Sequence, residues 1–543
     1  MTYLFDANTS VINEVEIKND ANNALRVNVQ NNNTFVSTSN PFPVAVQSDS
    51  TTPISIKFPD SGTTAFEELL SIPMVPVIQT DAVYGYDPTE MDKVEFGGAT
   101  VTAANSVFTL TTGTTPLSVA NLRTKRFLKY RPGQGSTARY TAAFTTGAYG
   151  FGQWAGLINA ENAYIFGYSD DKFGILHFYG GKSTIVRLNV GTAPNANQNA
   201  TITLDGTAYT IQLVSGTANA AAARIASNNQ FTSAGNAVTG WRAQQVGNTV
   251  SFVSNYPATR SGTYSFSSTG NATGSFNTLV AGNNSIEHWT WQEDWNGIQP
   301  TNFDPTKLNV YTISMRWLGA GIVRFGMEDP ASGKFITVHT QKWTSKNNFP
   351  HVDTPSFQLS YSASNYDASG SSVSIRASSM MGGIEGLVEQ ASRAHSASSV
   401  NTGNRSADTI HHVLTISNPI IATTNGNSNV INTREIIIKD ISFSFQGNDP
   451  VVVYVFVDPT PATGTHDFIA MPNTPTLQCN VAMTFSVTTD NPVATFVLPT
   501  NGTQQFDMSP YRLTVPPGSK MSIAFSSTSV VSRTAIATVW VED

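Results

Sequence analysis

Cysteine and charged residues are both scarce in this sequence. Its 543 residues include one cysteine, Cys479, and only 12% are charged, against about 25% in an average globular protein. One cysteine cannot form a disulfide within the chain or a cysteine-based zinc site. Packing and strand pairing must therefore hold the fold together. Asn, Thr, Ser and Gly take the places that Lys and Glu usually occupy, which is typical of an all-β protein with many turns.

Three further absences exclude classes of partner and location. The net charge is −7 and no basic run stands out, so we expect no nucleic-acid partner, because such proteins neutralise phosphates with clustered Lys and Arg. No apolar run reaches the roughly 20 residues that span a bilayer, so we expect no membrane insertion. The start, MTYLFDANTS, lacks the basic region and apolar core of a signal peptide, which predicts synthesis and folding in a cytoplasm.

Short alternating strands separated by turn residues predict an all-β, multi-domain chain. Hydrophobic residues make up 40% of the sequence, enough to build several cores. The predicted parts are an N-terminal arm (1–60), a connector (61–89), a β-sandwich (90–196 and 283–380), an α+β module inserted into it (197–282), a helix and linker (381–407), and a C-terminal β-sandwich or jelly roll (408–543).

The N-terminal arm begins with a predicted hairpin. Val15–Asp20 and Leu25–Val29 alternate apolar and polar residues around the turn-rich ANNA, a pattern of two short antiparallel strands. Pro41 and Pro43 restrict the following segment to an edge or an extended conformation. So small a piece is unable to bury a core alone. We expect an arm that docks on a partner or on copies of itself; a frayed terminus is the alternative.

The inserted module carries the clearest local signals. Thr201–Val214 contains an Asp-Gly turn between two alternating runs, which predicts a hairpin. Gly216–Ser227 follows as the best helix of the chain, with Thr217 as N-cap before an alanine run. A second helix is predicted over 382–397, although Gly386 weakens it.

The stretch FYGGKSTIV contains Gly181-Lys182-Ser183, the end of a phosphate-binding P-loop. That motif requires a glycine five residues before Gly181 and a helix after the Ser. The required position holds Leu176, and the residues after Ser183 are β-branched. We therefore predict a hairpin of the sandwich, with its tip at 180–183, and no nucleotide site.

Three stretches resemble bacteriophage virion proteins, especially fibre-type structural proteins of cyanophages. They are the opening YLFDANTSVINEVEIKNDANNALRVNV with STSNPFPVAV, the inserted module, and RTKRFLKYRPGQGSTARYTAAFTT with the related text around it. The last is similar to a concanavalin-like (laminin-G-like) sandwich of virus structural proteins. The resemblance covers roughly residues 1–380, and fold analogy alone assigns no function.

This resemblance implies a non-enzymatic structural protein of a tailed bacteriophage. Such a chain is made in the host cytoplasm and ends in the virion, as a fibre or a tail or baseplate component that contributes to host attachment. Its expected partners are other virion proteins and copies of itself, with a trimer expected by fibre analogy. Two alternatives remain: a lectin-like protein that recognises host surface polysaccharide, and a capsid decoration or minor capsid protein.

The strongest candidate binding site is HWTWQEDWNG. Trp289, Trp291 and Trp295 lie close in sequence to Glu293 and Asp294. Sugar rings stack on exposed aromatic side chains, and carboxylates orient their hydroxyl groups. Trp289 and Trp291 are two residues apart, so on a strand they share one face. The stronger interpretation is that they fill a core or an interface where the inserted module rejoins the sandwich, and glycan binding is the alternative.

Acidic residues supply a weaker candidate and no catalytic one. Asp170 and Asp171 occupy a predicted turn at a place where laminin-G-like sandwiches often hold calcium. Calcium takes six to eight oxygen ligands, so a solvated turn is the stronger interpretation. A glycosidase needs two carboxylates about 5–9.5 Å apart, and no such pair stands out. G-x-S-x-G is also absent. We therefore expect no enzyme and no cofactor, calcium apart.

Overall fold

The computed structural model describes most of the chain. The described residues are 14–19, 25–31, 34–35 and 74–542, apart from gaps at 233–238, 368–369, 387–393, 402, 424–428, 460, 464–467, 472–473, 475–476, 480–483, 486–490 and 512. The chain divides into two compact units, residues 1–59 and 60–543. The segment that contains Pro41 and Pro43, and the first part of the predicted connector, lie outside the described residues.

The first unit contains the predicted hairpin. Strand β1 (Glu14–Asn19) pairs antiparallel with β2 (Leu25–Asn31), and β2 also pairs with β3 (Thr34–Phe35). The register places Val15 opposite Val29. The hairpin is confirmed, while its role as a docking arm stays a prediction.

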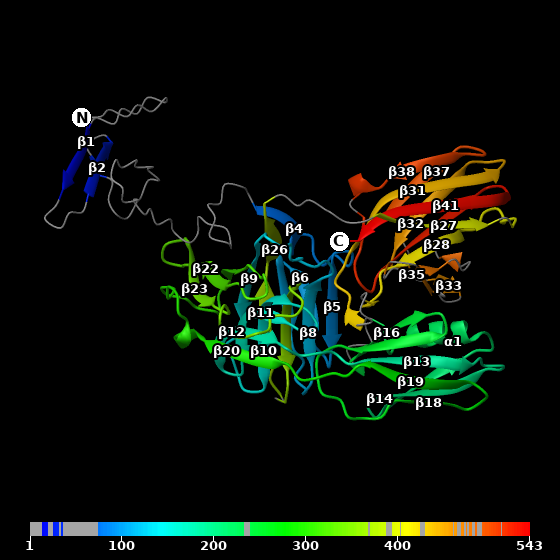
Figure 1. The fold of residues 1–543 in the computed structure, drawn as a ribbon, viewed down its shortest axis with the longest axis horizontal. Helices are drawn as coiled ribbons and strands as arrows, with labels where there is room; N and C mark the ends of the chain where they lie inside the picture. Colours follow the sequence, from blue (N-terminus) through cyan, green and yellow to red (C-terminus); the bar gives the residue numbers. More distant parts are fainter. Residues whose placement is uncertain are drawn as a thin grey trace. The chain divides into compact units, whose positions relative to one another are not determined.

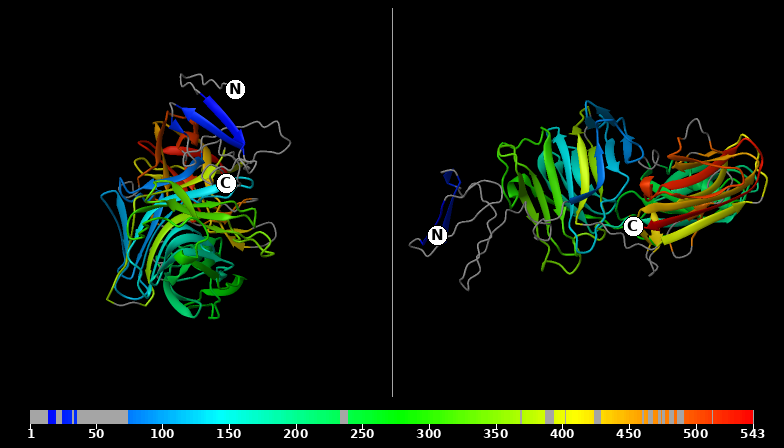
Figure 2. Two further views of the ribbon diagram at one scale, coloured as in Figure 1. Left: turned by 90° about the vertical axis from the view of Figure 1, so that its left-hand side faces the viewer. Right: turned by 90° about the horizontal axis from the view of Figure 1, so that it is seen from above.

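The largest part of the second unit is a sandwich of two antiparallel sheets, whose strands lie in two layers (Figures 1 and 2). One sheet has seven strands in the order β20-β12-β11-β10-β24-β8-β5. Their bounds are β5 Met91–Phe96, β8 Val119–Thr124, β10 Phe151–Ile158, β11 Ala163–Ser169, β12 Lys172–Tyr179, β20 Ile286–Trp291 and β24 Gln358–Asn365.

The facing sheet has nine strands and closes the sandwich. Seven of its strands have the order β23-β22-β21-β9-β25-β7-β6. The other two are β26, which pairs with β9, and β4, which pairs with β26. The bounds are β4 Met74–Asp81, β6 Thr100–Ala104, β7 Val107–Thr111, β9 Ser136–Phe144, β21 Asn309–Met315, β22 Val323–Glu328, β23 Phe335–Gln341, β25 Ser374–Ala377 and β26 Ser379–Glu385. Strand β4 lies in the segment predicted as a connector, so the sandwich begins earlier than expected.

Aromatic side chains fill the space between the two sheets. Phe166 of β11 lies 4.9 Å from Tyr311 of β21, ring centre to ring centre, and both side chains are buried. Tyr140 of β9 donates a hydrogen bond to the carbonyl of Ala155 in the opposite sheet at 2.8 Å. The alternation of the strands thus points one set of side chains from each sheet into a common core.

The inserted module has two sheets, one helix and its own core. Its sheets have the orders β16-β17-β13-β19 and β15-β14-β18. The bounds are β13 Ile185–Thr192, β14 Gln198–Leu204, β15 Thr207–Leu213, β16 Trp241–Val246, β17 Thr249–Ser254, β18 Ser265–Ser268 and β19 Thr273–Val280. The hairpin predicted around Asp205-Gly206 is confirmed as β14–β15.

The predicted helix of the module is also confirmed. Helix α1 spans Ala218–Ala226, and the Thr217 hydroxyl accepts a hydrogen bond from the backbone N–H of Ala220 at 3.1 Å. This satisfies one of the four N–H groups that a helix start leaves free. Ala222 and Ile225 of the helix are buried in the module's core.

The predicted hairpin around Gly180–Ser183 is wrong. Strands β12 and β13 do not pair: β12 pairs with β11 and β20, whereas β13 pairs with β17 and β19. Residues 180–183 are instead the link from the sandwich into the module, which therefore begins near residue 184 and not at 197. The rejection of a P-loop agrees with the structure, because a strand follows Ser183.

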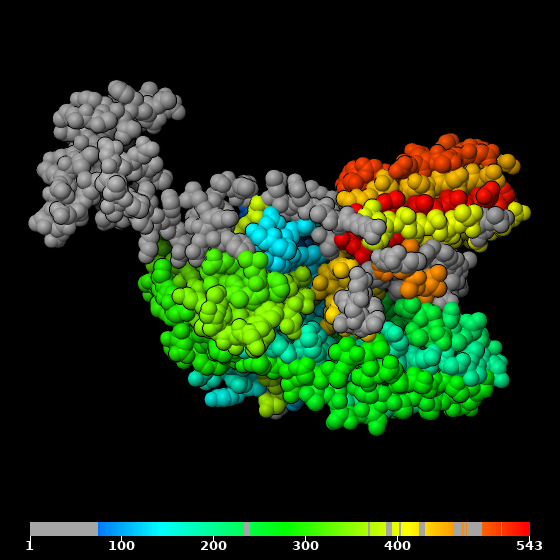
Figure 3. Space-filling view, viewed as in Figure 1, coloured from blue at the N-terminus to red at the C-terminus, as the bar shows by residue number. Residues whose placement is uncertain are grey.

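A second sandwich forms the C-terminal part. Its sheets have the orders β27-β41-β31-β38, with β39 beside β31, and β34-β35-β28-β40-β32-β37. Figure 3 shows the paired strands β41 and β27 as adjacent red and yellow bands. The bounds are β27 Ala394–Asn401, β28 His411–Ser417, β31 Ile436–Gly447, β32 Val451–Val457, β34 Ile469–Ala470, β35 Leu477–Cys479, β37 Ala494–Leu498, β38 Thr503–Asp507, β39 Thr514–Val515, β40 Lys520–Ser527 and β41 Val531–Glu542.

The predicted helix and linker over 381–407 are corrected by this arrangement. Residues 382–385 belong to β26 and residues 394–401 to β27, so both described ends of the predicted helix are strands. Gly382 and Gly383 lower helix propensity, and pairing with β9 and β4 decides the conformation. The C-terminal sandwich consequently starts at residue 394 and not at 408.

The prediction of an all-β, multi-domain chain is confirmed. The concanavalin-like assignment of the first sandwich stays a prediction. Across the part of the chain that the structure describes, no helix has the length and apolar character needed to cross a bilayer.

Candidate functional site

The seven-stranded sheet has two faces with different surroundings. Its inner face points into the sandwich core and includes Tyr164 and Phe166 of β11. We call the opposite side the outer face. The strand register determines which side chains lie on the outer face, because residues directly opposite each other on neighbouring strands share a face. Trp154 lies opposite Ser362, and Ser362 lies opposite Asn121.

The predicted tryptophan pair lies on this outer face. Trp289 and Trp291 are half-buried in β20, and their rings are parallel within 9° with centres 5.0 Å apart. The Lys172 ammonium lies 5.6 Å from the centre of the Trp291 ring. Trp289 packs against a small apolar cluster that includes Phe178 and lies outside the sandwich core. The shared face is confirmed, and both rings keep surface that a ligand can contact.

Trp295 does not belong with that pair. Its side chain is only 5% exposed and packs in the sandwich core against Phe166. The indole N–H donates to the carbonyl of Thr290 at 3.3 Å. A short 3-10 turn over Gln292–Asp294 reverses the direction of the side chain. The expectation that Trp295 contacts a glycan is therefore wrong.

Glu293 and Asp294 lie in that 3-10 turn, and both are exposed. Exposed carboxylates beside an aromatic pair can accept hydrogen bonds from sugar hydroxyl groups. Their part in glycan binding stays a prediction.

The two candidate calcium ligands lie in the turn between β11 and β12. Asp170 has a positive φ of 54°, and its Oδ1 accepts a hydrogen bond from the backbone N–H of Gly150 at 2.8 Å. Asp171 is exposed. Within the described residues, no group of three or more His, Cys, Asp and Glu side chains is placed to hold a metal ion. The geometry favours a turn residue for Asp170, since Asp tolerates this conformation and caps backbone groups.

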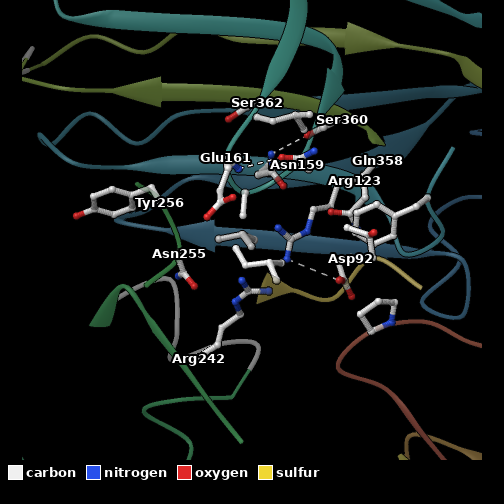
Figure 4. Close-up of a pocket in the computed structure, with 18 of the residues that line it drawn as sticks. Asp92, Arg123, Asn159, Glu161, Arg242, Asn255, Tyr256, Gln358, Ser360 and Ser362 are labelled. Carbon is white, nitrogen blue, oxygen red and sulfur yellow. Dashed lines mark hydrogen bonds and ion pairs between the residues drawn. The ribbon is translucent and has the colours of Figure 1, made fainter. Parts of the chain in front are cut away.

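A cavity of about 580 Å³ lies on the outer face, away from the core (Figure 4). Its floor is the sheet, and residues of the inserted module and the C-terminal sandwich form the remaining walls. The volume is within the range of small-molecule sites. The lining residues that bear polar or aromatic groups include Asp92, Asn121, Arg123, Trp154, Asn159, Glu161, Arg242, Asn255, Tyr256, Glu287, Gln358, Ser360 and Ser362.

Two arginines of this cavity lack strong partners. Arg242 extends from β16 toward Arg123 of β8 (Figure 4), and the described residues offer the Arg242 guanidinium no hydrogen bond or ion pair. Arg123 has one long ion pair, 3.8 Å from its Nη2 to Asp92 Oδ2. The Nε–H groups of both arginines are buried without a partner among the described residues. Burial and then the positive charge of Arg123 lower the pKa of Arg242 to about 10, while Asp92 raises it.

The other charges near the cavity are already paired or exposed. Glu161 accepts a hydrogen bond from the backbone N–H of Ser183 at 2.8 Å and lies 3.4 Å from Lys182 Nζ. Lys182 is also 2.9 Å from Asp353. This pairing fixes the link between sandwich and module. Glu287 is exposed.

A second, smaller cavity of about 320 Å³ adjoins the edge of the same sheet. His177 forms part of its wall; its Nε2 donates to the carbonyl of His351 at 2.7 Å, and its Nδ1 accepts from the Gln341 amide at 2.6 Å. Burial lowers the pKa of His177 to about 3 and that of His351 to about 4. Both imidazoles are therefore neutral at pH 7, and this arrangement stabilises the sandwich.

Sequence reasoning missed Arg123, Arg242 and Trp154. They come from NLRTKRF, GWRAQQ and GQWAG, which are far apart in the chain and carry no common motif. One signal was available: arginine is rare in this sequence, and both arginines stand on alternating strands. That signal does not say which strands meet.

Comparisons with known proteins identify no family. No protein-family model and no curated protein sequence matches the chain. Among solved structures, the chain is similar to one from the atomic structure of Sulfolobus turreted icosahedral virus, at 7% identity and a TM-score of 0.15. The match covers 83% of this chain and 89% of that one. A TM-score this low carries no argument about fold or function.

Proposed function

We propose that the chain is a non-enzymatic structural component of a tailed-bacteriophage particle, in a fibre, tail or baseplate, and that it contributes to host attachment. The observation that carries the proposal is the opening sequence, whose predicted hairpin forms in a unit separate from the β-rich body. A small separate unit with short strands suits docking on other virion proteins or on copies of the chain, and a trimer is our expectation. Few charges also suit wide, permanent interfaces.

Labelling of particles tests this proposal. Antibodies against residues 74–542 would be applied to purified particles of the virus that encodes the chain, and electron microscopy would locate the label. We expect label on the tail or its fibres. Label on the head would support a decoration or minor capsid protein instead. Mass spectrometry that finds no such chain in purified particles would contradict a virion role altogether.

Glycan recognition is the second candidate, and the stacked Trp289–Trp291 pair favours it. Parallel half-buried indoles on an open sheet face offer the flat apolar surface on which a sugar ring stacks. Polysaccharide of the host surface is the proposed ligand. A glycan array with wild-type protein should give binding that Trp289→Ala with Trp291→Ala abolishes. Tyr149→Ala is the control, because Tyr149 is exposed elsewhere on the sandwich.

An assay for polysaccharide breakdown tests the proposal that the chain is not an enzyme. Incubation of the purified chain with host envelope polysaccharide should leave the chain length of the polymer unchanged. Release of reducing ends would contradict the proposal and direct attention to the carboxylates of the cavity, Glu161 and Glu287.

A further inference from the structure

The cavity on the outer face contains positive charge that the described protein does not neutralise. Both arginine side chains are partly exposed, but the Nε–H group of each is buried, and a buried donor without a partner costs free energy. Arg242 has no such partner among the described residues, and Arg123 has only the 3.8 Å contact to Asp92. The two guanidinium groups face each other across the cavity (Figure 4). Like charges in this arrangement repel; burial and then the charge of Arg123 lower the pKa of Arg242.

We propose that this cavity binds an acidic saccharide, with its carboxylate or sulfate group held between Arg123 and Arg242. A planar guanidinium donates two parallel hydrogen bonds to an oxyanion, and two such groups enclose it from both sides. The bound anion satisfies the free Nε–H groups and removes the repulsion between the arginines. The proposal rests on the second candidate function, glycan recognition, and adds to it a separate anchor for an acidic group, in a cavity that Trp289 and Trp291 do not line.

Three observations favour a saccharide over a free inorganic anion. The cavity of about 580 Å³ is much larger than an oxyanion and has room for sugar rings. Neutral hydrogen-bonding groups, Asn121, Ser360 and Ser362, cross its floor. Trp154 beside them supplies an aromatic ring and a buried indole N–H that has no partner among the described residues.

Negative groups limit how the ligand can lie. Glu161 and Glu287 also line the cavity, but Glu161 is occupied by Lys182 and the Ser183 amide, and Glu287 is exposed. The oxyanion therefore belongs at the arginine pair, with the neutral ring hydroxyls directed toward the carboxylates. Asp92 is expected to keep its contact with Arg123, which orients that guanidinium.

Isothermal titration calorimetry on the full chain tests the proposal. The probes are glucuronic acid, glucose 6-sulfate, glucose and inorganic sulfate at constant ionic strength. We expect at least one acidic sugar to bind at least tenfold more tightly than glucose and than inorganic sulfate. Equal binding of sulfate and the acidic sugars would overturn the saccharide assignment, and no binding of any anion would overturn the site.

Arg242→Met should weaken binding of the acidic sugar at least tenfold, and Arg123→Met should do the same. Arg224→Met is the matched control, because Arg224 is an exposed residue of the same module; it should leave the affinity unchanged. Unchanged affinity in Arg242→Met would overturn the proposal.

Thermal unfolding without ligand separates a binding role from a structural one. Arg242→Met removes an unpaired charge, so its Tm should equal or exceed that of the wild type; a lower Tm would assign Arg242 to the fold and count against the site. Labelling of particles is independent of these results. A chain that binds acidic sugars but is absent from particles contradicts the virion role and leaves the site intact.

Discussion

The two faces of the seven-stranded sheet are built by the same strands and differ in almost every property. On the inner face, the buried Tyr361 packs against Tyr140, and its one O–H is within hydrogen-bond distance of the carbonyl oxygens of Thr141 and Ser379, at 3.0 and 3.1 Å. On the outer face, Arg123 of β8 and Trp154 of β10 keep donors without partners in the described structure. The inner face therefore contributes to the sandwich core, whereas the outer face keeps polar groups without a partner among the described residues.

A substitution on the inner face should cause the largest loss of folding stability. Trp295→Ala removes a buried indole from the core and should lower the free energy of unfolding of the sandwich by about 3–5 kcal/mol, as large-to-small core changes do. Trp289→Ala on the outer face is the matched change and should cost less than about 1.5 kcal/mol. Differential scanning calorimetry measures both. Equal losses would erase the distinction between the faces.

Low pH should have the second-largest effect on stability, through the buried side chains of His177 and His351. The pKa values of His177 and His351 are lowered to about 3 and about 4, below the usual value of about 6.5. The unfolded state therefore binds more protons, so stability is full above pH 6.5 and falls as pH decreases toward those values. By pH 5 the loss is about 2 kcal/mol for each histidine.

Thermal unfolding between pH 7 and pH 5 measures this dependence. His177→Gln should reduce its slope, since the amide does not titrate. His351→Gln should reduce the slope in the same way, because burial also lowers the pKa of His351. A slope that His177→Gln does not alter would contradict the neutral, buried state of His177.

The turn at the edge of the sheet should give a smaller effect. Asp170→Ala removes the hydrogen bond to the Gly150 amide and should cost about 1 kcal/mol. Asp171→Ala, its exposed neighbour, should change stability by less than about 0.5 kcal/mol. Addition of calcium should leave the Tm of the wild type unchanged; an increase that both variants lose would establish the calcium site instead.

Trp291 on the outer face should also have only a small effect on folding. Trp291→Ala removes a half-buried ring that lies outside the sandwich core, so the free energy of unfolding should change by about 1 kcal/mol or less. Calorimetry measures the stability of this variant, and a glycan array measures its binding. A large loss of stability together with unchanged glycan binding would make the ring pair a structural feature.

Local sequence signals predicted the elements well and their partners poorly. Alternation identified the strands, and Thr217 marked the start of the helix correctly, because both depend on neighbouring residues. The same signals did not predict the partners of β13. We expected this strand to form a sandwich hairpin with the strand before it, but it pairs with β17 and β19. Pairing between distant strands depends on the whole core, and no local pattern encodes it.

The candidate site was also predicted only in part. Spacing of two residues correctly put Trp289 and Trp291 on one face, but the turn over Gln292–Asp294 directs Trp295 into the core. Arg123 and Arg242 are separated by more than a hundred positions and meet only through the insertion of the module. Their proximity is a property of the tertiary structure.

A crystal structure of the full chain with a hexuronate-containing oligosaccharide would show whether the outer face of the sheet recognises ligands. We predict electron density for the acidic group within hydrogen-bond distance of both Arg123 and Arg242, and for sugar rings over Asn121 and Trp154. A saccharide bound on another surface, with the cavity between the arginines empty, would contradict the account.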